Sequence, residues 1–132
     1  IYVTSGRRLI GLSPSDGETF TAVMPAQYHS APLVYGNLLI VGSDGPPGGI
    51  YAFDAVTGKL VWEFLSVPKP GEVGHETWLN DAWQNHPNLF HWSFSMTIDS
   101  ELGLLYTAFE SPGPYDYYGA DRPGDNLFGN SI

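Results

Sequence analysis

A short hairpin unit that occurs twice constrains the fold of this chain more than any other feature. The clearer copy reads IYAFDAVTGKLV and begins at Ile50. An alternating apolar strand leads into Asp54, whose carboxylate can close an Asx turn, and resumes after Gly58, which adopts positive φ at no steric cost. This pattern predicts two antiparallel strands joined by a tight turn.

The same unit lies about 41 residues earlier in the chain. The sequence LIGLSPSDGETF begins at Leu9 and places Ser13 where the later copy has Asp54. Gly17 then falls in the place of Gly58. Repeats of about 40 to 45 residues with four strands each are typical of β-propeller blades, which bury their faces against neighbouring blades. We therefore expect part of a β-propeller.

The composition agrees with an all-β fold. The 132 residues include 16 glycines and 11 prolines, and 42% are hydrophobic, which excludes the composition of a disordered chain. No window of helical periodicity is longer than about two turns. The predicted strands are Ile1–Thr4, Arg8–Leu12, Thr19–Val23, Ala31–Val34, Leu38–Val41, Ile50–Asp54, Leu60–Phe64, Trp92–Ile98 and Leu104–Phe109.

Charge and residue usage exclude several kinds of partner. Five basic residues against 14 acidic residues give a formal net charge of -9, which repels phosphate backbones and anionic lipids. We therefore expect no nucleic-acid binding. There are no cysteines, so neither disulfides nor thiolate metal sites are available.

The chain opens on a strand-like segment and closes on NLFGNSI, so residues 1–132 are expected to form a partial propeller domain truncated at both ends.

Two long segments interrupt the blade pattern. Residues 67–91 are rich in proline, glycine, asparagine, histidine and tryptophan, and residues 110–126 contain ESPGPYDYYGADRPGDN. Both are too long to be plain connections between strands. Long loops on rigid scaffolds tend to carry function, so both segments are expected to be functional loops.

The motifs in these loops, together with the hairpins, resemble one family. YHSAPLVYGNLLIVGSDG, GGIYAFDAVTGKLVWEF, PGEVGHETWLNDAW, DSELGLLYTAFESPGP and DRPGDNLFGNSI follow the order found in quinoprotein dehydrogenases that use pyrroloquinoline quinone (PQQ). Non-catalytic propellers share the hairpin unit, whereas the combination of GHETW, DAW and RPGDN is specific. The chain thus resembles a piece of the eight-bladed propeller of PQQ-dependent alcohol and glucose dehydrogenases, about two to three four-stranded antiparallel blades in extent.

The resemblance implies an oxidoreductase. Such enzymes oxidise alcohols or sugars, with PQQ held near the propeller axis beside Ca2+, and pass the electrons to a respiratory acceptor in the periplasm. A hard cation polarises the quinone carbonyl, and a carboxylate base removes the substrate proton. The family's catalytic aspartate lies downstream of RPGDN, beyond Ile132. No catalytic residue is therefore assigned here, and the isolated chain is expected to be inactive.

The resemblance also implies cofactor-binding residues. Trp78 is the first candidate for the indole that stacks on PQQ, and Trp83 is the second. Asp44 and Gly45 fall where the family has a Ser-Gly pair that touches the quinone, and His29 falls where a threonine often bonds the cofactor. The alternatives are a packing role for Trp78, a turn role for Asp44 and a plain surface position for His29.

The expected metal site departs from the family pattern. Pro46 and Pro47 stand where a glutamate ligand is expected, and a proline side chain cannot ligate a metal. His91 stands near the position of an asparagine ligand, and an imidazole prefers softer metals than Ca2+. Asp44 and His91 are the metal-ligand candidates, and the alternative for His91 is a hydrogen-bonded histidine beside aromatic residues.

Arg122 in DRPGDN has a structural interpretation. A guanidinium between carboxylates can hold a long loop by charge-assisted hydrogen bonds, while the Pro-Gly pair after it makes a turn. We expect a clamp near the site rather than a catalytic group.

Two further hypotheses remain. In the first, the propeller has lost its cofactor chemistry and serves as a binding or assembly scaffold, which Pro46, Pro47 and His91 favour. In the second, the 132 residues form a small β-protein by themselves. Because two to three blades cannot close a ring, an isolated chain is expected to expose blade edges and apolar faces and to self-associate through them.

Overall fold

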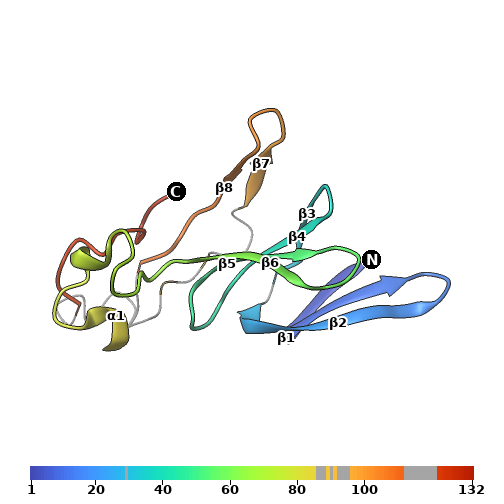
Figure 1. The fold of residues 1–132 in the computed structure, drawn as a ribbon, viewed down its shortest axis with the longest axis horizontal. Helices are drawn as coiled ribbons and strands as arrows, with labels where there is room; N and C mark the ends of the chain where they lie inside the picture. The colour runs from blue at the N-terminus through green and yellow to red at the C-terminus, as the bar shows by residue number, and fades with distance from the viewer. Residues whose placement is uncertain (29, 86–88, 90, 92–95, 112–121) are drawn as a thin grey trace.

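The computed structural model describes residues 1–28, 30–85, 89, 91, 96–111 and 122–132, which form three antiparallel sheets and two very short helices (Figure 1). This arrangement confirms the predicted all-β class. The elements in chain order are β1 (Tyr2–Ser13), β2 (Gly17–Tyr28), β3 (Leu33–Tyr35), β4 (Leu38–Gly42), β5 (Gly49–Asp54), β6 (Leu60–Leu65), η1 (His75–Thr77), α1 (Ala82–Asn85), β7 (Thr97–Asp99) and β8 (Leu104–Tyr106).

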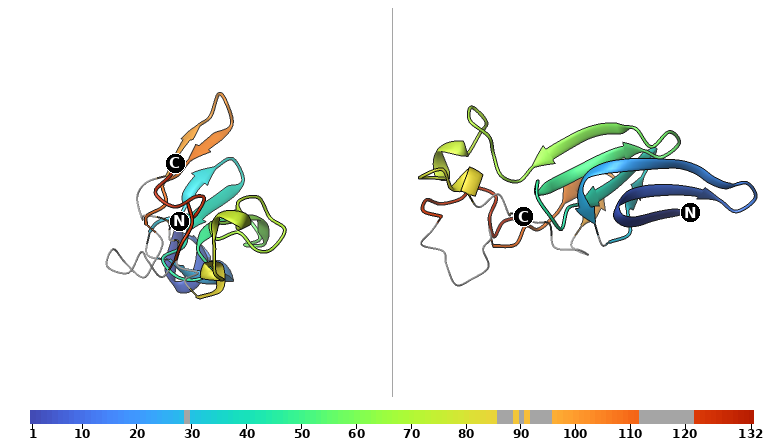
Figure 2. Two further views of the ribbon diagram at one scale, coloured as in Figure 1. Left: turned by 90° about the vertical axis from the view of Figure 1, so that its left-hand side faces the viewer. Right: turned by 90° about the horizontal axis from the view of Figure 1, so that it is seen from below.

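The central sheet is a single four-stranded blade. Its strands follow the order β3-β4-β5-β6, and each strand pairs antiparallel with the next strand in the chain. The β1–β2 and β7–β8 hairpins form separate two-stranded sheets that flank it (Figure 2). Two to three blades were predicted, and the described residues form one complete four-stranded blade between two hairpins.

Alternating residues of β4 and β5 bury both faces of this blade. Tyr51 and Phe53 pack with Leu9 and Met24 of the first hairpin. Ile50 and the other residues of opposite parity belong to a second core, which the β7–β8 hairpin and the long loops cover. Since successive side chains of a strand point to opposite faces, a strand buried on both sides reads as a continuous apolar run. The blade is therefore enclosed from two sides, as the repeat predicted.

Both copies of the repeated turn have the expected geometry. Gly17 and Gly58 have φ of 82° and 68°, values that favour glycine. The Asp54 Oδ1 accepts hydrogen bonds from the amides of Val56 at 3.0 Å and Thr57 at 2.7 Å. A side chain at Gly58 would overlap the ring of Phe20, so the first hairpin packs directly on the second turn.

The first hairpin is longer than its predicted strands. The separate strands predicted at residues 1–4 and 8–12 form one strand, β1, with a register shift near Gly6, where φ is 57°. Its partner β2 continues to Tyr28 instead of ending at residue 23. The glycine lets the strand bend without ending, and a bulge of this kind was not evident from the sequence.

The third hairpin is shorter than predicted. The strand predicted at residues 104–109 ends as β8 at Tyr106, and Phe109 pairs instead with His91 in an isolated bridge. Of the strand predicted at residues 92–98, β7 covers the end, while residues 92–95 lie outside the described part of the chain.

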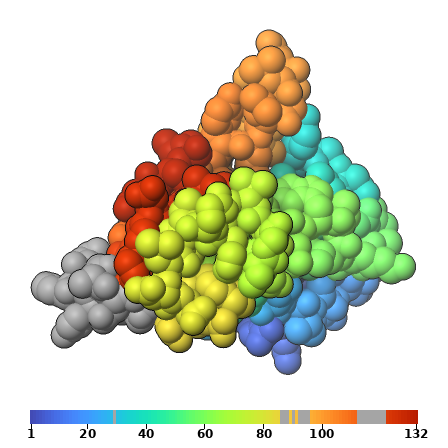
Figure 3. Space-filling model, turned by 60° about the vertical axis from the view of Figure 1, so that its left-hand side comes forward, coloured from blue at the N-terminus to red at the C-terminus, as the bar shows by residue number. Residues whose placement is uncertain are grey.

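The long loops gather at one end of the sheets, opposite the β5–β6 turn (Figures 1 and 2). Figure 3 shows the C-terminal residues packed beside the loop that follows β6. Neither helix in the described segments is long and apolar enough to cross a membrane. The fold thus presents a rigid blade with a cluster of loops at one edge.

Candidate functional site

The connection between β4 and β5 forms the base of the candidate site. The Gly49 amide donates to Ser43 Oγ at 2.7 Å, and the Ser43 amide donates to the Gly49 carbonyl at 2.9 Å. The Asp44 amide donates to the carbonyl of Gln27 at the end of β2, at 2.8 Å. These bonds fix Asp44 and Gly45 at the end of the blade and tie them to the preceding hairpin. Both residues are half-buried.

His91 lies at the same end of the blade. Its amide donates to the Ser43 carbonyl at 3.0 Å, and its ring packs so closely on Gly42 that a side chain there would overlap it. The side chain is 2% exposed. Burial lowers the pKa of His91 to about 4, and the neighbouring Asp44 carboxylate acts in the opposite direction. The two predicted metal-ligand candidates therefore lie together, with His91 neutral at pH 7.

This pair does not by itself fit a calcium site. Ca2+ takes about six to eight oxygen ligands. Asp44 offers one carboxylate, His91 offers a ring nitrogen, and Pro46 and Pro47, joined by a cis peptide bond, offer no side-chain ligand. Within the described ranges, no group of three or more histidine, cysteine, aspartate or glutamate residues is placed to hold a metal ion.

The chain that leaves β6 crosses over the end of the blade. Ser66 donates its amide to the Gly48 carbonyl at 3.1 Å and its hydroxyl to the Leu89 carbonyl at 2.5 Å. Gly48 lies directly beneath that Leu89 carbonyl, where a side chain would overlap it. This crossing was not predicted from the sequence, where its local signal is the small residue at Gly48 and at Ser66.

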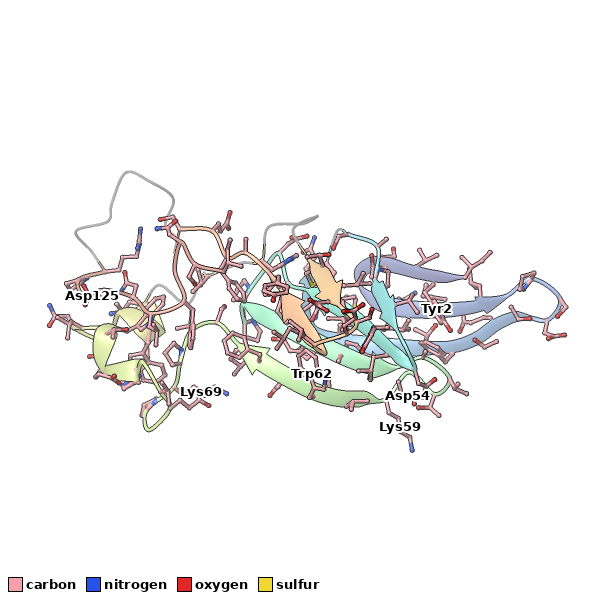
Figure 4. The ribbon with its side chains drawn as sticks, turned by 90° about the horizontal axis from the view of Figure 1, so that it is seen from above. Tyr2, Asp54, Lys59, Trp62, Lys69 and Asp125 are labelled. Atoms are coloured by element: carbon pink, nitrogen blue, oxygen red, sulfur yellow. The ribbon has the colours of Figure 1, made fainter. Side chains whose placement is uncertain are left out.

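Trp83 on α1 faces a pocket beside the β4–β5 connection. The pocket has a volume of about 170 Å³. It is lined by Trp83, Pro47, Gly48, Leu65, Val67 and Lys69. The indole is half-buried and meets the ring of His75 edge-to-face, with centroids 5.3 Å apart. Figure 4 places Lys69 at the loop end of the molecule, far from Asp54 at the β5–β6 turn.

Trp78 has different surroundings. It is 3% exposed, packs in the second core with Ala82 and Leu89, and donates its indole N–H to the Leu127 carbonyl at 3.4 Å. Of the two tryptophans proposed to stack on PQQ, Trp83 is therefore the one with an accessible ring surface here. His29, the remaining cofactor candidate, lies outside the described residues.

The second long loop is fastened to the first. Arg122 donates to Asn126 Oδ1 at 3.1 Å and to Ser111 Oγ at 3.2 Å, so these bonds hold the second loop through an amide and a hydroxyl rather than through the predicted carboxylates. The Asn126 amide donates to the Thr77 carbonyl at 3.1 Å, and the Leu127 amide donates to Thr77 Oγ1 at 2.8 Å. The segment that carries Trp83 is thus held between the blade and the C-terminal loop.

Comparisons with known proteins identify the family. Residues 11–132 match the PQQ family described as the β-propeller domain of glucose, ethanol and alcohol dehydrogenases. Quinohemoprotein alcohol dehydrogenase ADH IIB of Pseudomonas putida is 32% identical over 154 aligned positions, which cover 100% of this chain and 22% of the relative. Methanol dehydrogenase [cytochrome c] subunit 1 of Paracoccus denitrificans is 30% identical, over 77% of this chain and 19% of the relative.

A solved structure has the same fold. Quinohemoprotein alcohol dehydrogenase ADHIIG of Pseudomonas putida HK5 superposes with a TM-score of 0.82 and 28% identity, over 97% of this chain and 22% of that structure. The chain therefore spans about a fifth of the length of such relatives. On the family match and the shared fold, the chain belongs to the PQQ β-propeller family of glucose, ethanol and alcohol dehydrogenases.

Proposed function

We propose that the full-length protein containing this segment is a PQQ-dependent dehydrogenase that oxidises an alcohol. The carrying observation is that Trp83 lines a pocket with Pro47 and Gly48 of the β4–β5 connection, and that Asp44 and Gly45, for which the resemblance implies cofactor contacts, lie on the same connection. Bound PQQ would supply the two-electron acceptor for the oxidation. The catalytic base is not assigned to any residue of this segment. Sugars remain a second substrate class, because the matching family includes glucose dehydrogenases.

The described residues would contribute binding and orientation. The Trp83 indole offers an aromatic surface for stacking on a planar quinone. The β4–β5 connection carries Asp44 on a backbone held by the Ser43–Gly49 hydrogen bonds. His91 is held neutral and buried close by. The family's calcium ion would require oxygen ligands beyond those that Asp44 provides.

The acceptor and compartment complete the proposal. A related methanol dehydrogenase carries cytochrome c in its name, which supports a respiratory electron acceptor for this protein as well. We place the enzyme in the periplasm on family resemblance. The segment 1–132 is proposed to be a partial propeller domain with functional loops at 67–91 and 110–126, inactive when isolated.

Reconstitution tests this function. The full-length protein is incubated with PQQ, with and without Ca2+, and dye reduction is followed with primary alcohols and with aldoses. We expect alcohol-dependent turnover and a bound-cofactor absorbance band, both lost in Trp83→Ala. No turnover and no cofactor absorbance would overturn the proposal.

The alternative is a non-catalytic propeller that serves as a binding or assembly scaffold. It is favoured by Pro46, Pro47 and His91 at the expected ligand positions. Under this alternative, the full-length protein is folded and stable but does not bind PQQ at any Ca2+ concentration.

A further inference from the structure

We infer that the β4–β5 connection of this chain excludes a metal ion rather than holding one, although the resemblance implies a calcium ligand there. Asp44 and His91 are the candidate ligands, and by themselves they do not fit a calcium site. The hydrogen bonds and side chains around them extend this disagreement to the whole connection. The inference concerns metal binding alone, so it does not depend on which substrate the full-length protein oxidises.

The oxygens of Ser43, at the start of the connection, are engaged within the protein. The Gly49 amide donates to Ser43 Oγ at 2.7 Å, and the His91 amide donates to the Ser43 carbonyl at 3.0 Å. Each donor brings the positive end of an N–H dipole to the oxygen that it binds. A cation at the same oxygen would therefore be repelled by that dipole.

The carbonyls after the proline pair are engaged as well. The hydroxyl of Tyr51, a residue with no exposed surface in the core between the blade and the first hairpin, donates to the Pro47 carbonyl at 3.1 Å. The Gly48 carbonyl accepts from the Ser66 amide at 3.1 Å. Both carbonyls are thus directed at donors of the protein.

The side chain at position 47 has surroundings that suit packing rather than metal binding. Pro47 lines a pocket together with the apolar side chains of Leu65, Val67 and Trp83. Lys69 lines the same pocket and contributes a positive charge to it. A proline side chain has no ligand atom, and a neighbouring ammonium group repels a second cation.

His91 does not replace the missing oxygen ligands. Its Nδ1 lies against Gly42, in the place that a side chain of residue 42 would occupy, and the residue is 2% exposed. An imidazole nitrogen also suits softer metals than Ca2+. Asp44 then provides the one carboxylate of residues 43–48, whereas Ca2+ affinity depends on the number of charged ligands.

Metal titration of the full-length protein, freed of metal with a chelator and without PQQ, tests this inference. Calorimetry follows binding of Ca2+, and luminescence follows binding of Tb3+ as a second probe. Asp44→Asn removes the carboxylate of the connection, and Asp125→Asn, the same change at an exposed position of the C-terminal loop, is the matched control. Melting temperatures check that both variants fold.

We expect Asp44→Asn to leave the metal affinity of the full-length protein unchanged. A protein that binds no metal, or that binds it equally well in both variants, supports the inference. An affinity that falls about tenfold or more in Asp44→Asn, but not in Asp125→Asn, would place an ion on the connection and overturn it.

A restoring variant tests the physical reason for the exclusion. Pro47→Glu combined with Lys69→Gln places a carboxylate where the resemblance expects a glutamate and removes the opposing ammonium group. Ca2+ affinity should rise about tenfold or more over Lys69→Gln alone, because the connection gains a second carboxylate. No gain in a folded double variant would overturn the role given to Pro47 and Lys69. Because these titrations contain no PQQ, a failure to bind PQQ would count against the proposed function and not against this inference.

Discussion

The imidazole of His91 lies directly against Gly42, in the place that any side chain on residue 42 would occupy. The contact joins the start of the bridge to Phe109 with the last residue of β4. It explains how a loop residue 49 positions along the chain from Gly42 reaches the same end of the blade as Asp44. Glycine is required here for close approach rather than for its backbone angles.

Gly42→Ala should lower the free energy of unfolding of the full-length protein by about 1 to 3 kcal/mol, because the added methyl group displaces a buried ring. Urea denaturation measures the change. Gly45→Ala is the control, since its added carbon would come no closer than 3.8 Å to a neighbouring atom. His91→Ala removes the ring with which the added methyl group clashes. In a double-mutant cycle, the double variant should therefore lose less unfolding free energy than the sum of the losses in the two single variants. Strict additivity would contradict the contact.

Asp54→Ala should lower the thermal midpoint at pH 7, because its carboxylate accepts hydrogen bonds from the turn and from Asn37 Nδ2. Bonds from Thr57 lower the pKa of Asp54 below its ordinary value of 3.8. The stabilisation is therefore present above the unfolded pKa and is lost as pH falls through the folded pKa. Calorimetry should show the difference between Asp54→Ala and wild type shrinking toward pH 3, with Lys59→Gln unaffected. If the difference in thermal midpoint between Asp54→Ala and the wild type did not change with pH, the charge of the Asp54 carboxylate would not be the source of the stabilisation.

Thr77→Val should loosen the contact between the two long loops. The Thr77 hydroxyl accepts from the Leu127 amide and donates to the Gly74 carbonyl at 2.6 Å. The valine removes both bonds, each worth about 0.5 to 1.5 kcal/mol, because the exposed Leu127 amide can bond to water instead. Limited proteolysis should cut the C-terminal loop faster, and Thr77→Ser should restore the wild-type rate. Equal cleavage of all three proteins would show that the bonds are dispensable.

His91→Asn should make PQQ binding depend more strongly on Ca2+, because an amide oxygen replaces an imidazole nitrogen beside Asp44. The measurement compares PQQ dissociation constants in excess Ca2+ and in excess chelator. His91→Gln, with the same amide on a longer side chain, is the control for geometry. A Ca2+ dependence unchanged from the wild type would place the metal elsewhere.

The isolated 132-residue chain should self-associate, because β6 leaves apolar side chains uncovered. Leu60, Val61, Trp62 and Phe64 are 36 to 54% exposed on this one strand (Figure 4 labels Trp62). Trp62→Gln should reduce the associated fraction in analytical ultracentrifugation, whereas Val23→Thr, on the first hairpin, should not. A monomeric wild-type chain that melts cooperatively would refute this expectation.

The amino-acid sequence by itself determined the features that depend on neighbouring residues. The turn at Asp54 and Gly58 was predictable because its hydrogen bonds and backbone angle arise within five residues. The apolar residues of β5 were likewise predicted to form a strand, which the structure buries on both faces. The loop motifs were sufficient to identify the family. These patterns depend on residues close together in the sequence, so they can be interpreted without knowledge of the rest of the fold.

Only the tertiary structure decided which side chains occupy the site. Trp78 and Trp83 are similar in sequence context, yet Trp78 is buried against Leu127, 49 residues away, while Trp83 faces the pocket. The pairing of Gly48 with Leu89 and the bond from His75 to Pro68 are equally invisible in the sequence. Such contacts depend on where the loops cross the end of the blade, and that path is set by packing between distant segments rather than by local backbone preference.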